Sequence, residues 1–154
     1  MKSNKSIILG IVIILVVIFI TTGCGFYNLV EAGEFKDHFG ALGYSVSETE
    51  TPIYEADTYL VATKSDVPFK IEYYEFDEEV EAKKVYKKYT DNTAHYITSD
   101  SKNTETTGAV FTKFVAVSTK EYIVVSRVKN TLIFIAGTNE YANEINELLK
   151  NIDY

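Results

Sequence analysis

The sequence predicts an α+β protein in which a mostly antiparallel β-sheet carries helices packed on one face, after an N-terminal hydrophobic segment. Three observations favour this class. From about residue 26 onward the chain is enriched in Tyr, Val, Ile and Thr, the residue types that favour strands. Several short segments alternate apolar and polar side chains, as strands with one buried and one solvated face do. Between these segments, apolar residues recur at helical spacing.

The N-terminus combines a short basic segment with an apolar run. Lys2 and Lys5 precede residues 7–20, which hold only apolar side chains and one glycine. This order is typical of a secretory signal. Because 154 residues suit one domain and a leader, we expect a signal peptide or membrane anchor at 1–23. We expect a single extracytoplasmic α+β domain at 24–154.

The apolar run ends in Thr-Thr-Gly-Cys-Gly at residues 21–25. This segment resembles the lipobox of bacterial lipoproteins, in which a small residue precedes a cysteine that is lipidated on its sulfur and becomes the mature N-terminus. Gly23 and Thr22 suit the small positions, whereas Thr21 stands where the family usually has an aliphatic residue. The resemblance implies that Cys24 is the lipid attachment site. Two acyl chains there would give stable anchoring at the outer face of the cell membrane.

An uncleaved transmembrane helix is the alternative. Residues 6–30 form a stretch of 25 residues without a charge, and about 20 apolar residues suffice to cross the hydrocarbon core. In both interpretations Lys2 and Lys5 stay on the cytoplasmic side, so the C-terminal domain is expected outside.

The remaining elements follow from periodicity and turn residues. In chain order we expect a helix at 31–42, strands at 44–47, 58–63 and 69–76, a helix at 77–89, an irregular connection at 90–108, strands at 109–118, 122–128 and 131–136, and a helix capped by Thr138 that runs through residue 150. Phe35 and Phe39 give the first helix its apolar stripe, and Gly43 ends it. Asp77 can cap the second helix. The long connection is rich in Thr, Ser, Asn and Asp, which favour loops.

Two strands carry distinct burial patterns. In the strand at 69–76, we expect the face with Ile71 and Tyr73 to be buried and the face with Glu72 and Tyr74 to be solvated. The strand at 131–136 is apolar on both alternating faces, as expected for a central or doubly covered strand.

Two segments share one order of parts. Residues 59–89 and 122–152 both read strand, turn, strand, helix. Two pseudo-repeated β-hairpin-plus-helix units are one hypothesis, and ordinary α+β packing without duplication is the other.

Charge and cysteine content exclude several classes. The formal net charge of −7 repels phosphate backbones, so nucleic acid is not an expected partner. A single cysteine permits neither an intramolecular disulfide nor a zinc site of several thiolates. The four lysines of the second helix are expected to form a solvated face near its C-terminal end, where they favour the helix dipole.

Catalytic and metal-binding patterns are weak. His38 and His95 lie far apart and lack the spacing of a zinc motif, and no serine lies in a Gly-x-Ser-x-Gly elbow. The oxygen-bearing residues of the connection at 90–108 lack the repeat of a calcium loop. We therefore expect no metal, no cofactor and no catalytic residue, and expect that the protein is not an enzyme.

Tyrosine is the compositional outlier, with 12 residues against no tryptophan. Tyr74, Tyr122 and Tyr96 are candidates for a binding platform, because tyrosine combines apolar area with a hydrogen-bonding tip. The alternative is that the tyrosines fill the interface between sheet and helices.

Three functions stay open at this point. The first is a membrane-anchored, non-enzymatic binding or interaction module that contacts a protein or another component of the cell envelope. The second is a cell-envelope hydrolase that uses carboxylates such as Glu72 and Asp57, which would have to lie within about 5 to 10 Å of each other. The third is a single-pass membrane subunit of a larger assembly.

Overall fold

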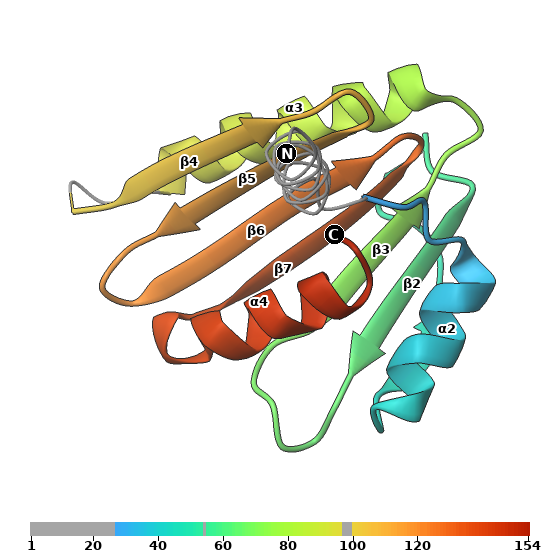
Figure 1. Ribbon diagram of the computed structural model, residues 1–154, viewed down its shortest axis with the longest axis horizontal. Helices are drawn as coiled ribbons and strands as arrows, with labels where there is room; N and C mark the ends of the chain where they lie inside the picture. Colours follow the sequence, from blue (N-terminus) through green and yellow to red (C-terminus); the bar gives the residue numbers. More distant parts are fainter. Residues whose placement is uncertain (1–26, 54, 97–99) are drawn as a thin grey trace, which may run out of the picture.

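The structure is a computed structural model that describes residues 27–53, 55–96 and 100–154; for 94–96 it describes the backbone alone. These described residues form one seven-stranded sheet and three α-helices (Figure 1). The elements are α2 (Ala32–Ala41), β1 (Ser45–Glu48), β2 (Thr58–Thr63), β3 (Ile71–Glu75), α3 (Glu79–Tyr96), β4 (Lys102–Thr107), β5 (Phe111–Val117), β6 (Glu121–Val128), β7 (Thr131–Thr138), the 3₁₀ turn η1 (Asn139–Tyr141) and α4 (Ala142–Asn151).

The expected signal or anchor at 1–23 and the lipid attachment site Cys24 lie outside the described residues. Within the described part of the chain, no helix has both the length and the apolar character needed to cross a bilayer.

Every neighbouring pair of strands in the sheet is antiparallel, which confirms the expected α+β class. The strand order is β1-β2-β3-β7-β6-β5-β4. β3 and β7 join the two halves of the sheet, so β7 is the central strand. Its two apolar faces in the sequence correspond to this position, because a central strand is covered on both sides.

The expectation that the helices pack on one face is wrong. α2 and α4 bury Phe35, Phe39, Ile145 and Leu149 in one core cluster, on the side nearer the viewer in Figure 1. α3 packs on the opposite face, in a second cluster that includes Val85. The reason lies in β7, whose alternating side chains are apolar on both faces and therefore need cover on both.

The pseudo-repeat hypothesis fails on the same observation. The hairpins β2–β3 and β6–β7 lie side by side, with β3 against the antiparallel β7. A repeat would require a rotation that exchanges the two hairpins and preserves their strand directions, and only a twofold axis perpendicular to the sheet does so. That rotation would leave the helices of both units on the same face of the sheet. α3 and α4 lie on opposite faces. The two units therefore share their order of parts but differ in hand.

The start of α2 is stabilised by a reciprocal capping arrangement. Glu31 is the N-cap, and a capping box links its side chain and backbone with those of Glu34. Gly43 ends this segment with a φ of 81°, which glycine adopts without a steric penalty. The helix predicted at 31–42 is confirmed.

The irregular connection predicted at 90–108 is wrong. α3 continues to Tyr96, and β4 occupies residues 102–107. Thr93 Oγ1 bonds to the carbonyl of Tyr89, and Lys87 pairs with Asp91 one turn on, so polar residues extend the helix. All six β4 side chains are exposed. Because β4 has no buried face, its sequence lacks the alternation of apolar and polar residues by which a strand is predicted.

The second face of β3 is also buried, contrary to the expectation of a solvated face. Tyr74 is fully buried and Glu72 is 7% exposed. The strand alternates apolar and polar residues, yet α3 and the loop before β2 cover the side that was expected to meet water.

Candidate functional site

The three candidate tyrosines do not form a shared exposed platform. Tyr74 is fully buried in the cluster under α3, whereas Tyr122 is 5% exposed and belongs to the cluster under α2 and α4. Tyr122 donates to Asn146 Oδ1 at 2.8 Å. The side chain of Tyr96 lies outside what the structure describes. Tyr74 and Tyr122 therefore act as core residues on opposite faces, as the alternative interpretation expected.

A polar cluster surrounds the carboxylate of Glu72. Tyr74 donates to Glu72 Oε2 at 2.5 Å, Lys70 Nζ lies 2.7 Å from Oε1, and the hydroxyls of Tyr74 and Tyr89 lie 2.7 Å apart. Burial, followed by the bond to Glu72, raises the pKa of Tyr74 far above its ordinary value. The hydrogen bond to Glu72 also raises the pKa of Lys70. Each of these groups has a partner, so the cluster is a satisfied polar network in which Tyr74 and Glu72 are buried and Lys70 reaches the surface.

Glu72 and Asp57 are not brought together as a hydrolase would require. Asp57 precedes β2 and is exposed, and its N–H donates to the carbonyl of Glu75. Glu72 faces Val61 in the register, four residues further along β2. Four strand residues span about 13 Å, which exceeds the separation of a carboxylate pair that cleaves glycosides.

Ser126 has no activating base. Its Oγ is buried and has no hydrogen-bond partner in the part of the chain that the structure describes. Lys113 is its neighbour in the β5–β6 register, but Lys113 Nζ donates to the backbone oxygen of Tyr154 at 3.2 Å. Since Ser126 is 0% exposed, a substrate does not reach it.

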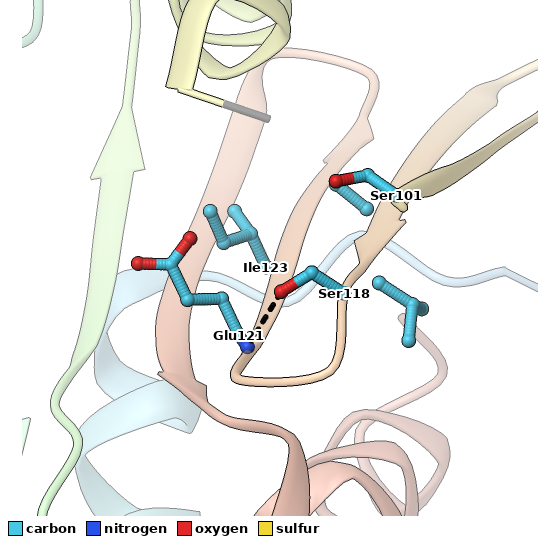
Figure 2. A pocket seen from close by; sticks show the side chains of 6 residues that line it. Ser101, Ser118, Glu121 and Ile123 are labelled. Atoms are coloured by element: carbon cyan, nitrogen blue, oxygen red, sulfur yellow. Dashed lines mark hydrogen bonds between the residues drawn. The ribbon is translucent and has the colours of Figure 1, made fainter. Parts of the chain in front are cut away.

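A small cavity lies beside the β5–β6 turn, between Ser101, Ser118, Glu121 and Ile123 (Figure 2). Its volume is about 10 Å³, the space of a single water molecule. Ser118 Oγ accepts the backbone N–H of Glu121 at 2.9 Å and that of Lys120 at 3.2 Å. The serine therefore stabilises the turn.

Metal ligation has little support among residues 27–53, 55–96 and 100–154, where no group of three or more His, Cys, Asp or Glu side chains gathers. Of the candidate calcium ligands at 90–108, Asp91 lies on α3 and Glu105 on β4. Asp91 bonds to Lys87, and Glu105 accepts from Tyr86.

A groove suited to a ligand lies between α3 and the β4–β5 hairpin, with a volume of about 580 Å³. We call it the α3 groove. Its principal lining side chains are Lys83, Tyr86, Lys87 and Asp91 of α3, Glu105 of β4, and Arg127 of β6. The side chains of β4 are all exposed and contribute nothing to the core. β4 instead forms one wall of the α3 groove.

Arg127 is the buried charge of the α3 groove. The residue is 4% exposed, and its Nη1 donates to Glu79 Oε1 at 3.1 Å and to the carbonyl of Lys129 at 2.8 Å. Nη2 donates to Thr112 Oγ1 at 3.4 Å. Buried arginine requires such partners, which fix its position.

Ion pairs hold the groove's other charges in place. Lys83 pairs with Glu79, and Lys87 with Asp91, both at 2.8 Å across one helical turn. The hydrogen bond from Lys83 lowers the pKa of Glu79 and so stabilises its carboxylate form. The lining holds three basic and two acidic side chains, on a chain with 15 basic and 22 acidic residues. The groove is therefore more basic than the chain as a whole.

The residues of this groove form no recognisable motif in the sequence. Arg127 is the chain's only arginine, and it occupies a strand whose alternate residues are apolar. A single arginine among the apolar residues of a strand was the one available indication of this site. An arginine is buried only where other residues pair with it, so its position indicates a polar cluster. Its partners come from α3 and β5, which pattern alone does not place beside β6.

No protein-family model matches this chain, and no curated protein sequence does. Among solved structures, the chain is similar to the crystal structure of a GTP binding regulator from Thermotoga maritima. The TM-score is 0.52 at 19% sequence identity, over 80% of this chain and 84% of that chain. At this identity the likeness shows the fold alone, and function must be argued from the site.

Proposed function

We propose that this chain is a membrane-anchored, extracytoplasmic lipoprotein whose domain binds a component of the cell envelope without catalysing a reaction. The observation that carries the proposal is the order of the N-terminal residues: two lysines, an apolar run, and the chain's single cysteine at its end. Chance placement of that cysteine at the spacing of a lipobox is improbable. A diacylated Cys24 supplies the two chains that stable anchoring requires.

The anchor predicts a defined chemical form of the protein. We expect membrane-extracted protein to have the mass of residues 24–154 plus lipid, measured by intact-mass spectrometry. Cys24→Ala should abolish both the lipid and the cleavage and give the full-length mass. A full-length wild-type mass in the membrane fraction would establish the single-pass helix instead. Intact wild-type protein in the cytosol would refute both forms of anchoring.

The α3 groove is the binding site that the geometry supports best. Its volume of about 580 Å³ is within the range of ligand and peptide sites. Lys83, Lys87 and Asp91 line the α3 wall of the groove, and Glu105 lines the β4 wall. Fixed mixed charges of this kind favour recognition of a polar partner segment by complementarity.

Charge reversal in the groove tests this assignment. A photo-cross-linking amino acid at Thr90, which lines the groove, should form an adduct with an envelope component in intact cells. Lys87→Glu should lower the adduct yield about tenfold, the effect of losing roughly 1.4 kcal/mol of binding free energy.

Lys84→Glu is the matched control. Lys84 is an exposed lysine of the same helix that does not line the groove, so its reversal changes the net charge equally. Equal losses from the two variants would show a general charge effect and would remove the groove as the contact.

A further inference from the structure

The domain holds its own N-terminal segment firmly from Tyr27 onward. The rings of Tyr27 and Phe111 are stacked, with centroids 3.5 Å apart and planes inclined by 15°. Asn28 Nδ2 donates to Asp153 Oδ2 at 2.9 Å, and the carbonyl of Val30 accepts from Tyr73 at 2.8 Å. The chain therefore has a fixed exit point beside the first residue of β5.

Phe111 is itself held in place. A Cβ added at Gly108 would lie 2.1 Å from its ring, so the close approach of ring and turn depends on glycine. Phe111 thus packs against the β4–β5 turn and against Tyr27. The stack is a rigid link between the sheet and the segment that leads to Cys24.

The link to the anchor is short. Cys24 and Tyr27 are three residues apart, and three extended residues span at most about 10 Å. A Cys24 held at the bilayer would therefore keep the surface near Tyr27 close to the lipid. A longer flexible tether would let the domain turn freely, whereas this link restricts which face meets the membrane.

The face beside this exit point has a composition distinct from the rest of the chain. We call it the β4–β5 front face. On β5 it carries Phe111, Val115 and Val117, which pack half-buried against the cluster under α2 and α4, and the half-buried Lys113. The register places Lys102, Thr104 and Thr106 of β4 beside them, all exposed.

None of these seven positions is acidic, although the chain carries 22 acidic residues. Of the two helices on this side of the sheet, α2 makes its main contacts with β1 and β2, and α4 with β7. Half-buried apolar side chains, threonines and an exposed lysine, with a tyrosine at the edge, suit the headgroup region of a bilayer.

We propose that the β4–β5 front face lies against the lipid surface, with its valines at headgroup level and Lys102 directed to lipid phosphates. The inference rests on the proposed function, since it needs the N-terminus to be held in the bilayer. It also assigns the opposite face of the sheet, which carries the α3 groove, to the aqueous side where a partner has access.

The absence of tryptophan makes the test direct. Thr104 and Asn103 are adjacent and exposed on β4, and they point to opposite faces of the sheet. We would place one tryptophan at each position in the full-length chain, as Thr104→Trp and Asn103→Trp. Each variant is reconstituted into vesicles of phosphatidylcholine and phosphatidylglycerol, with plain or brominated acyl chains.

Brominated lipid should lower the fluorescence of Thr104→Trp about twofold or more, because bromine quenches only a tryptophan that reaches the lipid. Asn103→Trp should change much less, and Val80→Trp, on an exposed position of α3, should not change. Since residues 103 and 104 contribute nothing to the core, both variants should fold, which far-UV circular dichroism verifies.

Flotation of the same samples separates the two proposals. Protein that fails to float with the vesicles contradicts the anchor. Protein that floats while Thr104→Trp and Asn103→Trp are quenched equally, or not at all, overturns the orientation and leaves the anchor intact. Protection of Thr104→Trp from both bromine and aqueous iodide would show that residues 7–26 or a second copy covers the face, and would equally overturn the inference.

Discussion

Raising the pH above about 10 is expected to unfold the domain in one cooperative step. Seven tyrosines are buried with a raised pKa: Tyr44, Tyr59, Tyr73, Tyr74, Tyr86, Tyr122 and Tyr154. Burial is the largest cause for each of them, and it raises the pKa of Tyr44 to about 12. In the unfolded chain a tyrosine ionises near pH 10.

The sign of the effect follows from proton linkage. Above pH 10 the unfolded chain releases tyrosine protons that the folded domain retains, so the free energy of unfolding falls as pH rises. Below pH 10 both states are protonated and the full stability is present. Each buried tyrosine contributes a slope of up to about 1.4 kcal/mol per pH unit. Seven together amount to about 10 kcal/mol per unit, comparable with the whole stability of a domain.

A pH titration of the full-length chain in mild detergent tests this prediction. Absorbance at 295 nm reports tyrosine ionisation, and far-UV circular dichroism recorded on the same samples reports the loss of secondary structure. Ionisation of the buried tyrosines should share one midpoint with the loss of secondary structure. Tyr74→Phe removes one titrating group and should make the dependence on pH less steep. Ionisation of all tyrosines with the dichroism unchanged would contradict the burial described here.

Phe39→Ala is expected to lower the free energy of unfolding by about 3 to 5 kcal/mol. Phe39 is 0% exposed, and its ring centroid lies 4.5 Å from that of Phe35 and 5.5 Å from that of Tyr44. Truncation leaves a cavity between α2 and the sheet. Because the Tyr27 segment runs directly into α2, the same change should also loosen the exit point of the N-terminal segment.

Leu42→Ala is the matched control, since Leu42 follows the same helix and is 38% exposed. We expect it to change stability by about 0.5 kcal/mol or less. Urea titration of the detergent-solubilised chain gives both values. Equal effects from the two substitutions would mean that α2 is not docked through Phe39.

The hydrophobic pattern of a short segment was sufficient to predict those strands and helices whose buried face is apolar. The strand at 58–63 was predicted with its actual bounds, and the double apolar character of 131–136 identified the central strand. The helix expected from Thr138 through residue 150 corresponds to η1 and α4. In each case the hydrophobic period of a short segment decided the element, because burial of that face provides the driving force.

The candidate site was beyond the reach of such patterns. β4 has no buried face and forms because β5 offers it backbone partners, so its sequence resembles a loop. Arg127 is held in the groove by hydrogen bonds to Glu79 on α3 and Thr112 on β5. Those partners lie 48 and 15 residues away in the sequence, and only the docking of helix on sheet brings them together.

The sequence by itself determined the fold class, most of the strands and the expectation of a membrane anchor, because each depends on hydrophobic character within a single segment. Tertiary structure alone decided which face each helix covers, which tyrosines are buried, and where the α3 groove lies. Those features depend on contacts between segments distant along the chain, and the hydrophobic period of one segment carries no information about the partner it will meet.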